Sequence, residues 1–361
     1  METYFIVIIS VCVLCLFADQ IDYVENPEVN DNLVDHTTST RYLYFAAACI
    51  LILVSGLRYM VGTDYWNYYY GYARHIERLP ESIWSFQDPG YGIIALFSSW
   101  FWNDGASAIF LSALLTVGLT LIVIYRHTDR LLMATFLYIT LGCWHSSFNG
   151  VKQYLAAAIL FCGIDALRRE EYLKWLAFVL VAALFHRSAI VMAVLCLLVY
   201  RKIGYKNLVI TLLITVIAAF SYDRIVDIAN IIMDKDYNPA GEYVSQAVNR
   251  LRVATAIIPA VVFFAAYKDK KDITRTEIFY VNICLIHAGI CVFTMNSALL
   301  YRIGIYTTPF LILAITELSK RLSDKLGKVI TIGMLGMYFT TWWYEISIRP
   351  SLVPFRFIWE R

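Results

Sequence analysis

Apolar blocks separated by short polar connections follow one another along almost the whole chain. The blocks are roughly 15 to 20 residues long, close to the length at which a helix crosses the core of a bilayer. Lipid offers the backbone no hydrogen-bond partner, so such blocks must be helical. The pattern predicts spans near residues 3–18, 43–57, 105–125, 131–148, 151–167, 173–200, 207–222, 253–267, 277–295, 303–318 and 328–345.

Two segments depart from this pattern. Block 173–200 is too long for one crossing and is interrupted by Phe185-His186-Arg187-Ser188, so we expect two short helices that meet there. Stretch 90–103 is too short to cross, and its glycines and aromatic residues indicate a re-entrant or interfacial piece. We therefore predict an all-α polytopic transmembrane helical bundle of about 11–12 spans, with one broken helix, in a single membrane-embedded domain over residues 1–361.

Composition agrees with a membrane protein. The chain is 60% hydrophobic and 16% charged, whereas soluble domains are about half apolar and a quarter charged. The net charge of +2 comes with no nucleic-acid-binding pattern, so no nucleic-acid partner is expected. The eight cysteines lie almost entirely in apolar blocks, which indicates small apolar residues rather than redox or metal chemistry.

Basic residues set the expected topology. Nine of the eleven lysines fall in connections that can share one side, and the positive-inside rule makes that side cytoplasmic. This assignment places both termini, the amphipathic or re-entrant segment 58–104 and a large loop over 221–252 outside. The first hydrophilic loop, 19–41, is acidic and would be cytoplasmic, so the orientation of the first hairpin stays open.

The opposite side carries arginine with almost no lysine. The guanidinium fork binds two phosphate oxygens at once and tolerates partial burial better than an ammonium group does. This face is therefore expected to handle anionic groups. Its arginines are Arg58, Arg74, Arg78, Arg187, Arg224, Arg250, Arg252 and Arg302.

The stretch GLRYMVGTDYWNYYY places an arginine, an aspartate and a run of tyrosines at the end of an apolar block. After Asp64, helical spacing puts Tyr65, Tyr68, Tyr72 and Ile76 on one face, as in a helix lying in the membrane interface. Two interpretations stay open here. Asp64 either caps an aromatic anchor helix, or it lies beside Arg58 while the tyrosines offer flat faces to sugar rings.

Two further stretches place polar residues against apolar helices. HSSFNGVKQYLAAAI puts Asn149, Lys152 and Gln153 on one helical face, which indicates either a cavity or a polar interhelical contact. In FHRSA, His186 is the histidine best placed for proton transfer, although it could equally be a structural, hydrogen-bonded group. A half-helix that starts at Ser188 beside Arg187 could help to hold an anion.

A fourth stretch, YRIGIY, begins the block at 303–318. Arg302 and Tyr306 are four residues apart and so share a helical face. They could contribute to the same outer site, or Arg302 could be a snorkelling interfacial anchor. All four stretches reach the outer boundary in the predicted topology.

The succession GLRYMVGTDYWNYY, QDPGYGI, FNGVKQYLAAAI, FHRSAIV and YRIGIYTTPF resembles the EpsG family, relatives of the bacterial Wzy-type exopolysaccharide and O-antigen polymerases. The likeness runs from about Tyr42 to Leu318. The chain departs from the family pattern at Lys152, where the family usually has arginine. The charge is retained there, but the bidentate fork is lost.

The resemblance implies a multi-pass glycosyltransferase of the bacterial cytoplasmic (inner) membrane with its active site facing outward. Such enzymes move a glycan from polyprenyl (undecaprenyl) pyrophosphate onto the next lipid-linked repeat unit, producing exopolysaccharide, capsule or O-antigen. The expected partners are the lipid-linked donor and acceptor, the bilayer, and the chain-length regulator and flippase of the pathway. No cofactor, nucleotide sugar or metal is expected.

On this resemblance, arginines and polar groups would bind pyrophosphate and sugar, while His186 or Asp64 would accept the proton of the attacking hydroxyl. Alternatives are an O-antigen-ligase-like transferase, a membrane acyltransferase, a lipid-linked oligosaccharide flippase, and a structural partner of an export complex. A flippase would show inverted repeats and mid-membrane polar residues. The candidate substrate-binding residues are Arg58, Tyr65, Tyr68, Asn149, Lys152, Gln153, Arg187, Ser188, Arg302 and Tyr306.

Overall fold

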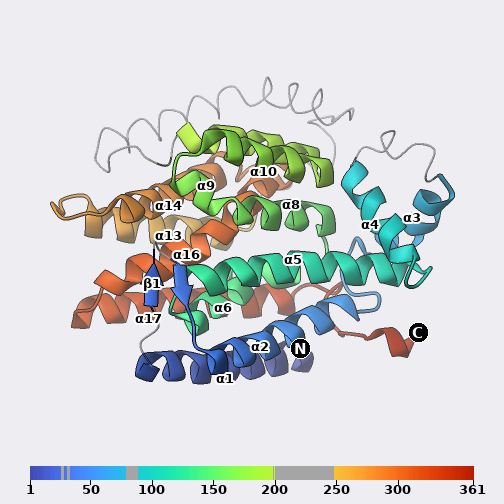
Figure 1. Ribbon diagram of the computed structural model, residues 1–361, viewed down its shortest axis with the longest axis horizontal. Helices are drawn as coiled ribbons and strands as arrows, with labels where there is room; N and C mark the ends of the chain where they lie inside the picture. The colour runs from blue at the N-terminus through green and yellow to red at the C-terminus, as the bar shows by residue number, and fades with distance from the viewer. Residues whose placement is uncertain (26–27, 31–32, 79–87, 198, 200–247) are drawn as a thin grey trace. The chain divides into compact units, whose positions relative to one another are not determined.

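A computed structural model describes the chain except for residues 26–27, 31–32, 79–87, 198 and 200–247 (Figure 1). The predicted span at 207–222 and most of the predicted outer loop at 221–252 lie outside the described residues. The count of about 11–12 spans therefore stays a prediction.

The described chain is almost entirely helical, which confirms the all-α polytopic transmembrane class. Its only described sheet is a two-stranded antiparallel hairpin of β1 (Glu28–Asn30) and β2 (Leu33–Asp35). Among the described residues, five helices are long and apolar enough to cross a membrane. They are α1 (Glu2–Glu25), α2 (Thr38–Gly56), α5 (Gly105–His127), α13 (Arg250–Tyr267) and α14 (Arg275–Phe293).

The helices form two compact units. The first unit contains Met1–Cys162, Val181–His186 and Trp342–Arg361, and the second contains Gly163–Leu180 and Arg187–Thr341. Along the chain, the division falls after Cys162, within helices after Leu180 and after Thr341, and between His186 and Arg187. The single-domain organisation expected from the sequence stays a prediction.

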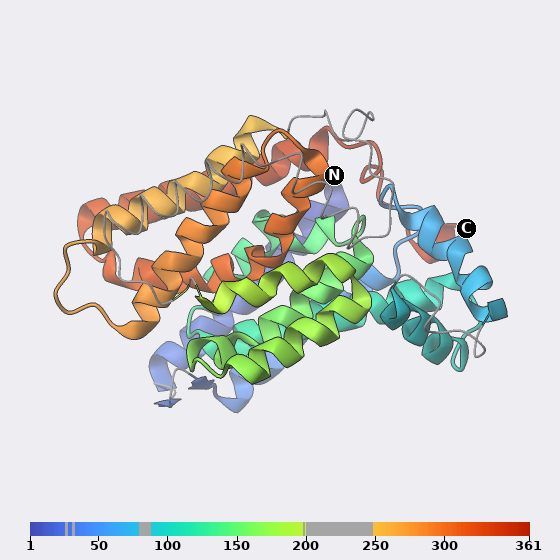
Figure 2. The ribbon, with the colours of Figure 1, turned by 90° about the horizontal axis from the view of Figure 1, so that it is seen from above.

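In the first unit, α5 is the central helix. It packs against α2 and α8 along its length, and against α3 and α4, which lie side by side (Figures 1 and 2). Helix α1 packs against α2 and α6. The remaining helices of this unit are α3 (Tyr65–Arg78), α4 (Pro89–Ser99), α6 (Leu131–Thr140), α7 (Cys143–Ser146), α8 (Val151–Cys162) and a 3₁₀ turn η5 (Ile358–Glu360).

The amphipathic helix predicted after Asp64 is present as α3. Tyr65 and Tyr72 are buried, while Trp66 and Tyr70 on the other face are exposed. The buried face exists because apolar side chains recur at helical spacing and meet the core around Tyr91. Helix α4 has 11 residues, so the prediction that this stretch is too short to cross is also confirmed.

Backbone geometry breaks the predicted span at 131–148 into two helices. Helix α6 ends at Thr140, and Gly142 adopts a positive φ of 87° before α7 begins. Glycine reaches this left-handed region without the steric cost that a Cβ atom imposes.

The broken helix is divided between the two units. Helix α10 (Tyr172–Phe185), whose end belongs to the first unit, stops at the predicted interruption, and a 3₁₀ helix η2 (Arg187–Leu197) follows. The break is as predicted, but the second piece is 3₁₀ rather than α and begins one residue before Ser188. The other elements of the second unit are α9 (Ile164–Arg168), α13, α14, α15 (Ala298–Tyr301), η3 (Arg302–Tyr306), α16 (Thr308–Leu318), η4 (Ser319–Arg321) and most of α17 (Lys325–Ser347).

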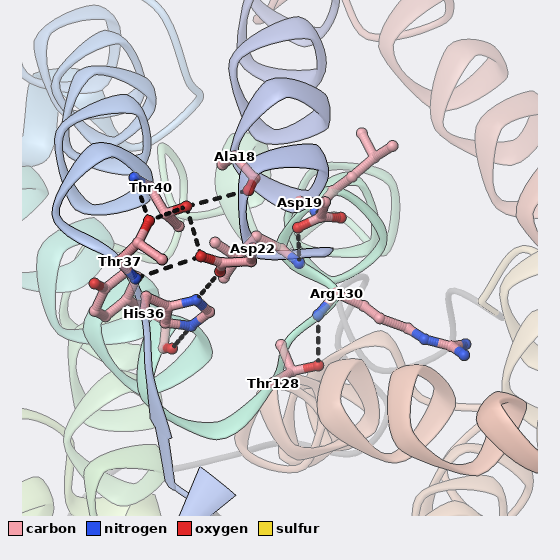
Figure 3. A network of polar contacts seen from close by, with 11 residues as sticks. Ala18, Asp19, Asp22, His36, Thr37, Thr40, Thr128 and Arg130 are labelled. Carbon is pink, nitrogen blue, oxygen red and sulfur yellow. Dashed lines mark hydrogen bonds and ion pairs between the residues drawn. The ribbon is translucent and has the colours of Figure 1, made fainter. Parts of the chain in front are cut away.

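A buried polar network fixes the connection between α1 and α2 onto the C-terminal end of α5 (Figure 3). One carboxylate oxygen of Asp22 accepts a hydrogen bond from the Thr40 hydroxyl at 2.7 Å, and the other lies against His36 Nδ1. His36 Nε2 donates to the carbonyl of Tyr125 at 2.6 Å. Every polar side-chain atom of this Asp–His pair therefore has a polar partner within the fold.

Asp19 secures the neighbouring helix in the same region (Figure 3). Its carboxylate accepts hydrogen bonds from the backbone N–H groups of Leu131 at 2.8 Å and Leu132 at 3.1 Å. These are the first amides of α6, which have no partner within the helix itself. Asp19 thus acts as a cap supplied from another helix, joining α1 to α6.

Candidate functional site

Arg58 follows α2 directly and is buried, with 2% of the residue exposed. Its guanidinium donates to the carbonyl of Ser55 and lies 4.8 Å from the centre of the Phe148 ring. Its Nε has no hydrogen-bond partner among the described residues. Burial lowers the pKa of Arg58 to about 10, so the group is still charged at neutral pH.

The C-terminal segment holds the turn that carries Arg58. The N–H of Tyr59 donates to the carbonyl of Arg356 at 2.8 Å, and the N–H of Gly62 donates to the carbonyl of Ser351 at 2.8 Å. Sequence analysis missed this contribution, because the segment after residue 347 carries no motif and lies almost 300 positions away along the chain.

Gly62 and Asn149 join two of the predicted stretches. Gly62 has a φ of +106°, and a Cβ atom there would lie 2.7 Å from the carbonyl oxygen of Phe148. Next to it, the N–H and hydroxyl of Thr63 both contact Asn149 Oδ1, at 2.7 and 3.1 Å. The G-T-D and N-G motifs are therefore neighbours because the glycine lets the two backbones approach closely.

The aromatic residues of α3 differ in what they expose. Tyr65 is 1% exposed, and its ring packs between Tyr59 and Tyr69 at centroid distances of 5.9 and 5.8 Å. Tyr68 is half-buried and its ring lies 5.3 Å from that of Tyr91. Asp64 is half-buried and immediately precedes the helix. The roles predicted for these three side chains in sugar binding or proton transfer stay predictions.

Lys152 and His186 both lie next to the carboxylate of Asp88. Lys152 Nζ is 3.1 Å from Asp88 Oδ2, and His186 Nδ1 is 4.0 Å from Asp88 Oδ1. The ammonium group also lies 5.2 Å from the centre of the Tyr91 ring. We call Asp88, Tyr91, Lys152 and His186 the Asp88 cluster.

The ionisable side chains of Asp88, Lys152 and His186 are partly exposed, whereas Tyr91 is buried. The side chain of Asp88 is 10% exposed, whereas those of Lys152 and His186 are 23% and 27% exposed. A charged pair in such a place is partly desolvated, which strengthens its electrostatic interaction while leaving it accessible to a ligand.

Local sequence explains how Asp88 reaches His186. Asp88 stands immediately before α4, and Pro89 begins the helix, a position where its missing N–H is no loss. Gly90 then packs so closely on Phe185 that a Cβ atom would lie 2.8 Å from its ring. The start of α4 therefore lies against the end of α10, which brings the carboxylate to the residue after Phe185.

The predicted polar face of α8 is only partly present. Lys152 and Gln153 are in the first turn of α8, and Gln153 is 5% exposed. Asn149 is not on the helix, which corrects the expectation of one continuous face. It lies two residues before the helix begins, because Gly150 separates the turn from Val151.

Four predicted site residues belong to the second unit. There the Ser188 hydroxyl and the Tyr306 hydroxyl lie 2.7 Å apart, which joins the start of η2 to the end of η3. Arg187 is half-buried at the first position of η2, and Arg302 is exposed at the first position of η3. Their participation in one site with the first-unit residues stays a prediction.

Asp88 and Tyr91 are the cluster members that sequence analysis did not select. Both lie in the run QDPGYGI, which carried part of the family resemblance. An aspartate before Pro-Gly also reads as an ordinary helix start, so the run alone gave no reason to assign it chemistry. Its significance comes from two partners that are distant in sequence.

The fold and this arrangement define a polytopic helical membrane protein whose first unit collects cations, a carboxylate, an imidazole and tyrosines. The chain belongs to the EpsG family, whose sequence profile matches residues 41–357, and this is a family of Wzy-like polymerases. Comparisons with curated proteins and with solved structures gave no significant match.

Proposed function

We propose that the protein is a membrane glycosyltransferase that polymerises polyprenyl-pyrophosphate-linked oligosaccharide repeat units. It would form exopolysaccharide, capsule or O-antigen at the outer face of the bacterial cytoplasmic membrane. The observation that carries the proposal is the Asp88 cluster, found in a chain that belongs to a polymerase family. There an ammonium group and an imidazole, which are groups able to bind phosphate and to accept a proton, lie next to one carboxylate.

The proposed reaction needs cations and a base. A hydroxyl of the acceptor sugar attacks the anomeric carbon of the donor, and the bond from that carbon to the pyrophosphate oxygen breaks. Negative charge develops on the leaving pyrophosphate, so fixed cations lower the barrier. Lys152 and the buried Arg58 are the first-unit candidates for this role. His186 or Asp64 accepts the hydroxyl proton.

The aromatic surface of α3 fits a lipid-linked substrate. Trp66 and Tyr70 are 48% and 54% exposed, and their rings stack with centroids 4.8 Å apart. Tryptophan and tyrosine favour the membrane–water interface, where a polyprenyl pyrophosphate carries its headgroup. This placement supports a site that receives its donor from the bilayer.

Reconstitution tests the proposal directly. The purified protein in proteoliposomes, given polyprenyl-pyrophosphate-linked repeat units and no nucleotide sugar, is expected to produce oligomers of increasing length and free polyprenyl pyrophosphate. Arg58→Ala is expected to lower this activity at least 100-fold, because one fixed donor to a developing anion is worth about 10²–10³ in rate.

The matched control is Lys328→Ala, which removes an exposed cation from α17 and should leave oligomer formation unchanged. Glycan transfer to a different acceptor without lengthening would favour a ligase-like transferase. Movement of the intact substrate across the bilayer without bond formation would favour a flippase. Wild-type activity in Arg58→Ala would remove that residue from the site.

Orientation needs its own experiment. Asn67→Cys on the exposed face of α3 is expected to react with a membrane-impermeant maleimide in intact cells, whereas Lys328→Cys is expected to react only after the cells are opened. The reverse pattern would place the candidate site on the cytoplasmic side and contradict the proposed outer location.

A further inference from the structure

We propose that Asp88 is a positioning residue that holds the imidazole of His186 with its proton on Nδ1, so that Nε2 is the proton-accepting atom. This inference rests on the proposed glycosyl transfer and selects one of its two candidate bases. It also assigns a role to a residue outside the sequence-based candidates.

The two carboxylate oxygens of Asp88 face different partners. Oδ2 faces the ammonium of Lys152 at 3.1 Å, and Oδ1 faces Nδ1 of His186 at 4.0 Å. An ionised carboxylate only accepts hydrogen bonds, so the ring nitrogen that faces it is favoured as the protonated one. In a neutral imidazole the other nitrogen, Nε2, then carries the lone pair.

The 4.0 Å distance between Asp88 Oδ1 and His186 Nδ1 is roughly 1 Å longer than a hydrogen bond. Catalytic hydrogen bonds are often long without substrate and shorten when it binds. Gly90 packs closely on Phe185, which keeps the segments that carry Asp88 and His186 near one another, and we expect a side-chain rotation to shorten the distance when substrate binds.

Lys152 is the cation that lies beside the carboxylate of Asp88. Within the first unit, Asp88 lies beside His186 and Lys152 lies beside Asp88. Arg187, the next residue after His186 in the chain, belongs to the second unit. Lys152 orients the carboxylate from its other oxygen. Since Lys152 is also a proposed pyrophosphate ligand, one side chain links donor binding to the alignment of the base.

The proton balance follows from this geometry. As the new bond forms from the acceptor oxygen to the anomeric carbon, the O–H bond breaks and the proton moves to Nε2 of His186. The electron pair of the broken glycosyl–phosphate bond leaves with the pyrophosphate. The resulting imidazolium keeps its Nδ1 proton directed at Asp88, whose negative charge stabilises it.

An NMR experiment tests the tautomer without requiring polymerase activity. The full-length protein is labelled with ¹⁵N-histidine in lipid nanodiscs, and the His186 signals are assigned with His186→Gln. Neutral wild-type protein is expected to show the Nδ1–H tautomer. In Asp88→Asn the amide can donate to Nδ1, so the Nε2–H tautomer is expected to increase. An Nε2–H tautomer in the wild type, or an unchanged ratio in Asp88→Asn, would overturn the inference.

The rates of the Asp88 variants provide a second test of the inference. Asp88→Asn is expected to lower kcat by roughly 10²–10⁴-fold with KM nearly unchanged, and Asp88→Glu is expected to restore part of the rate. Asp269→Asn, an exposed carboxylate of the second unit, should alter neither the rate nor the His186 spectrum.

A failure of the proposed function and a failure of the role proposed for Asp88 give different results. If the wild type forms no product while His186 shows the expected tautomer, the proposed function is wrong. If the wild type polymerises and Asp88→Asn retains its kcat, only the role of Asp88 is wrong. Thermal unfolding of each variant is measured alongside, and Asp88→Glu covers the case in which Asp88→Asn does not fold.

Discussion

Two aspartate–histidine pairs among the described residues of the first unit have opposite characters. Asp22 and His36 lie beside the C-terminal end of α5 and are 3% and 0% exposed as side chains. Asp88 and His186 lie in the part of the unit where Tyr91 shares a core cluster with Ala108, near the start of α5, and are 10% and 27% exposed. Identical residue types therefore meet very different surroundings.

The two pairs differ in their burial and in the distance between their partners. Both ring nitrogens of His36 lie at hydrogen-bonding distance from protein oxygens, and Asp22 also accepts from Thr40. A buried polar network satisfied in this way specifies and stiffens a structure. The imidazole of His186 is partly exposed and lies 4.0 Å from its carboxylate, which suits a group that acts on a ligand.

Removing the buried pair is expected to have the largest effect on stability. His36→Ala leaves the carboxylate of Asp22 without its ring partner, and breaking a buried pair costs about 3–5 kcal/mol. His186→Ala should change the free energy of unfolding by less than about 1 kcal/mol, because its pair is longer and partly exposed. Thermal unfolding in detergent compares the two variants. Equal losses of stability would erase the distinction between the pairs.

A glycine substitution tests how rigidly the candidate site is held. Gly62→Ala should cost about 1–3 kcal/mol, because an alanine there meets both a positive φ and the Phe148 carbonyl. Gly71→Ala on α3 is the matched control, since its added Cβ would meet no described atom within 4 Å beyond its chain neighbours and the backbone of its own helix. The control should gain up to about 1 kcal/mol from helix propensity. Oligomer formation should fall only in Gly62→Ala, and a parallel fall in both would show a general effect on α3.

The smallest expected effect concerns the pair that joins the C-terminal segment to α5. Arg361 donates to both carboxylate oxygens of Asp104, at 2.7 and 3.3 Å. Burial would raise the pKa of Asp104, but Arg361 and the N–H of Ala106 lower it below its ordinary value. Because both side chains are partly exposed, Arg361→Ala should cost at most about 1 kcal/mol.

The pH dependence of this pair has a definite sign. A carboxyl whose pKa is lower in the folded state stabilises the fold above its unfolded pKa, and the contribution is lost as the pH falls through the folded value. The difference in stability between wild type and Arg361→Ala should therefore be constant near neutral pH and shrink below about pH 4. A difference that grows in acid would contradict the assigned pair.

Several local features of this protein were determined by the sequence alone. The spacing of Tyr65, Tyr68 and Tyr72 predicted an amphipathic helix with these rings on one face, which is α3, and the polar run around His186 predicted the break after α10. Long apolar blocks predicted the helical membrane class. These features depend on neighbours within a few residues, so periodicity and backbone chemistry are sufficient to predict them.

Which polar groups meet depends on how distant segments of the chain pack together. Asp88 and Lys152 are 64 residues apart, and His186 lies further along the chain, so no local pattern joins them. The same holds for the C-terminal segment whose carbonyl groups hold the turn of Arg58. It also holds for the different burial of the two aspartate–histidine pairs. Spacing places a side chain on a face, but burial and partners come from distant segments that pack against that face.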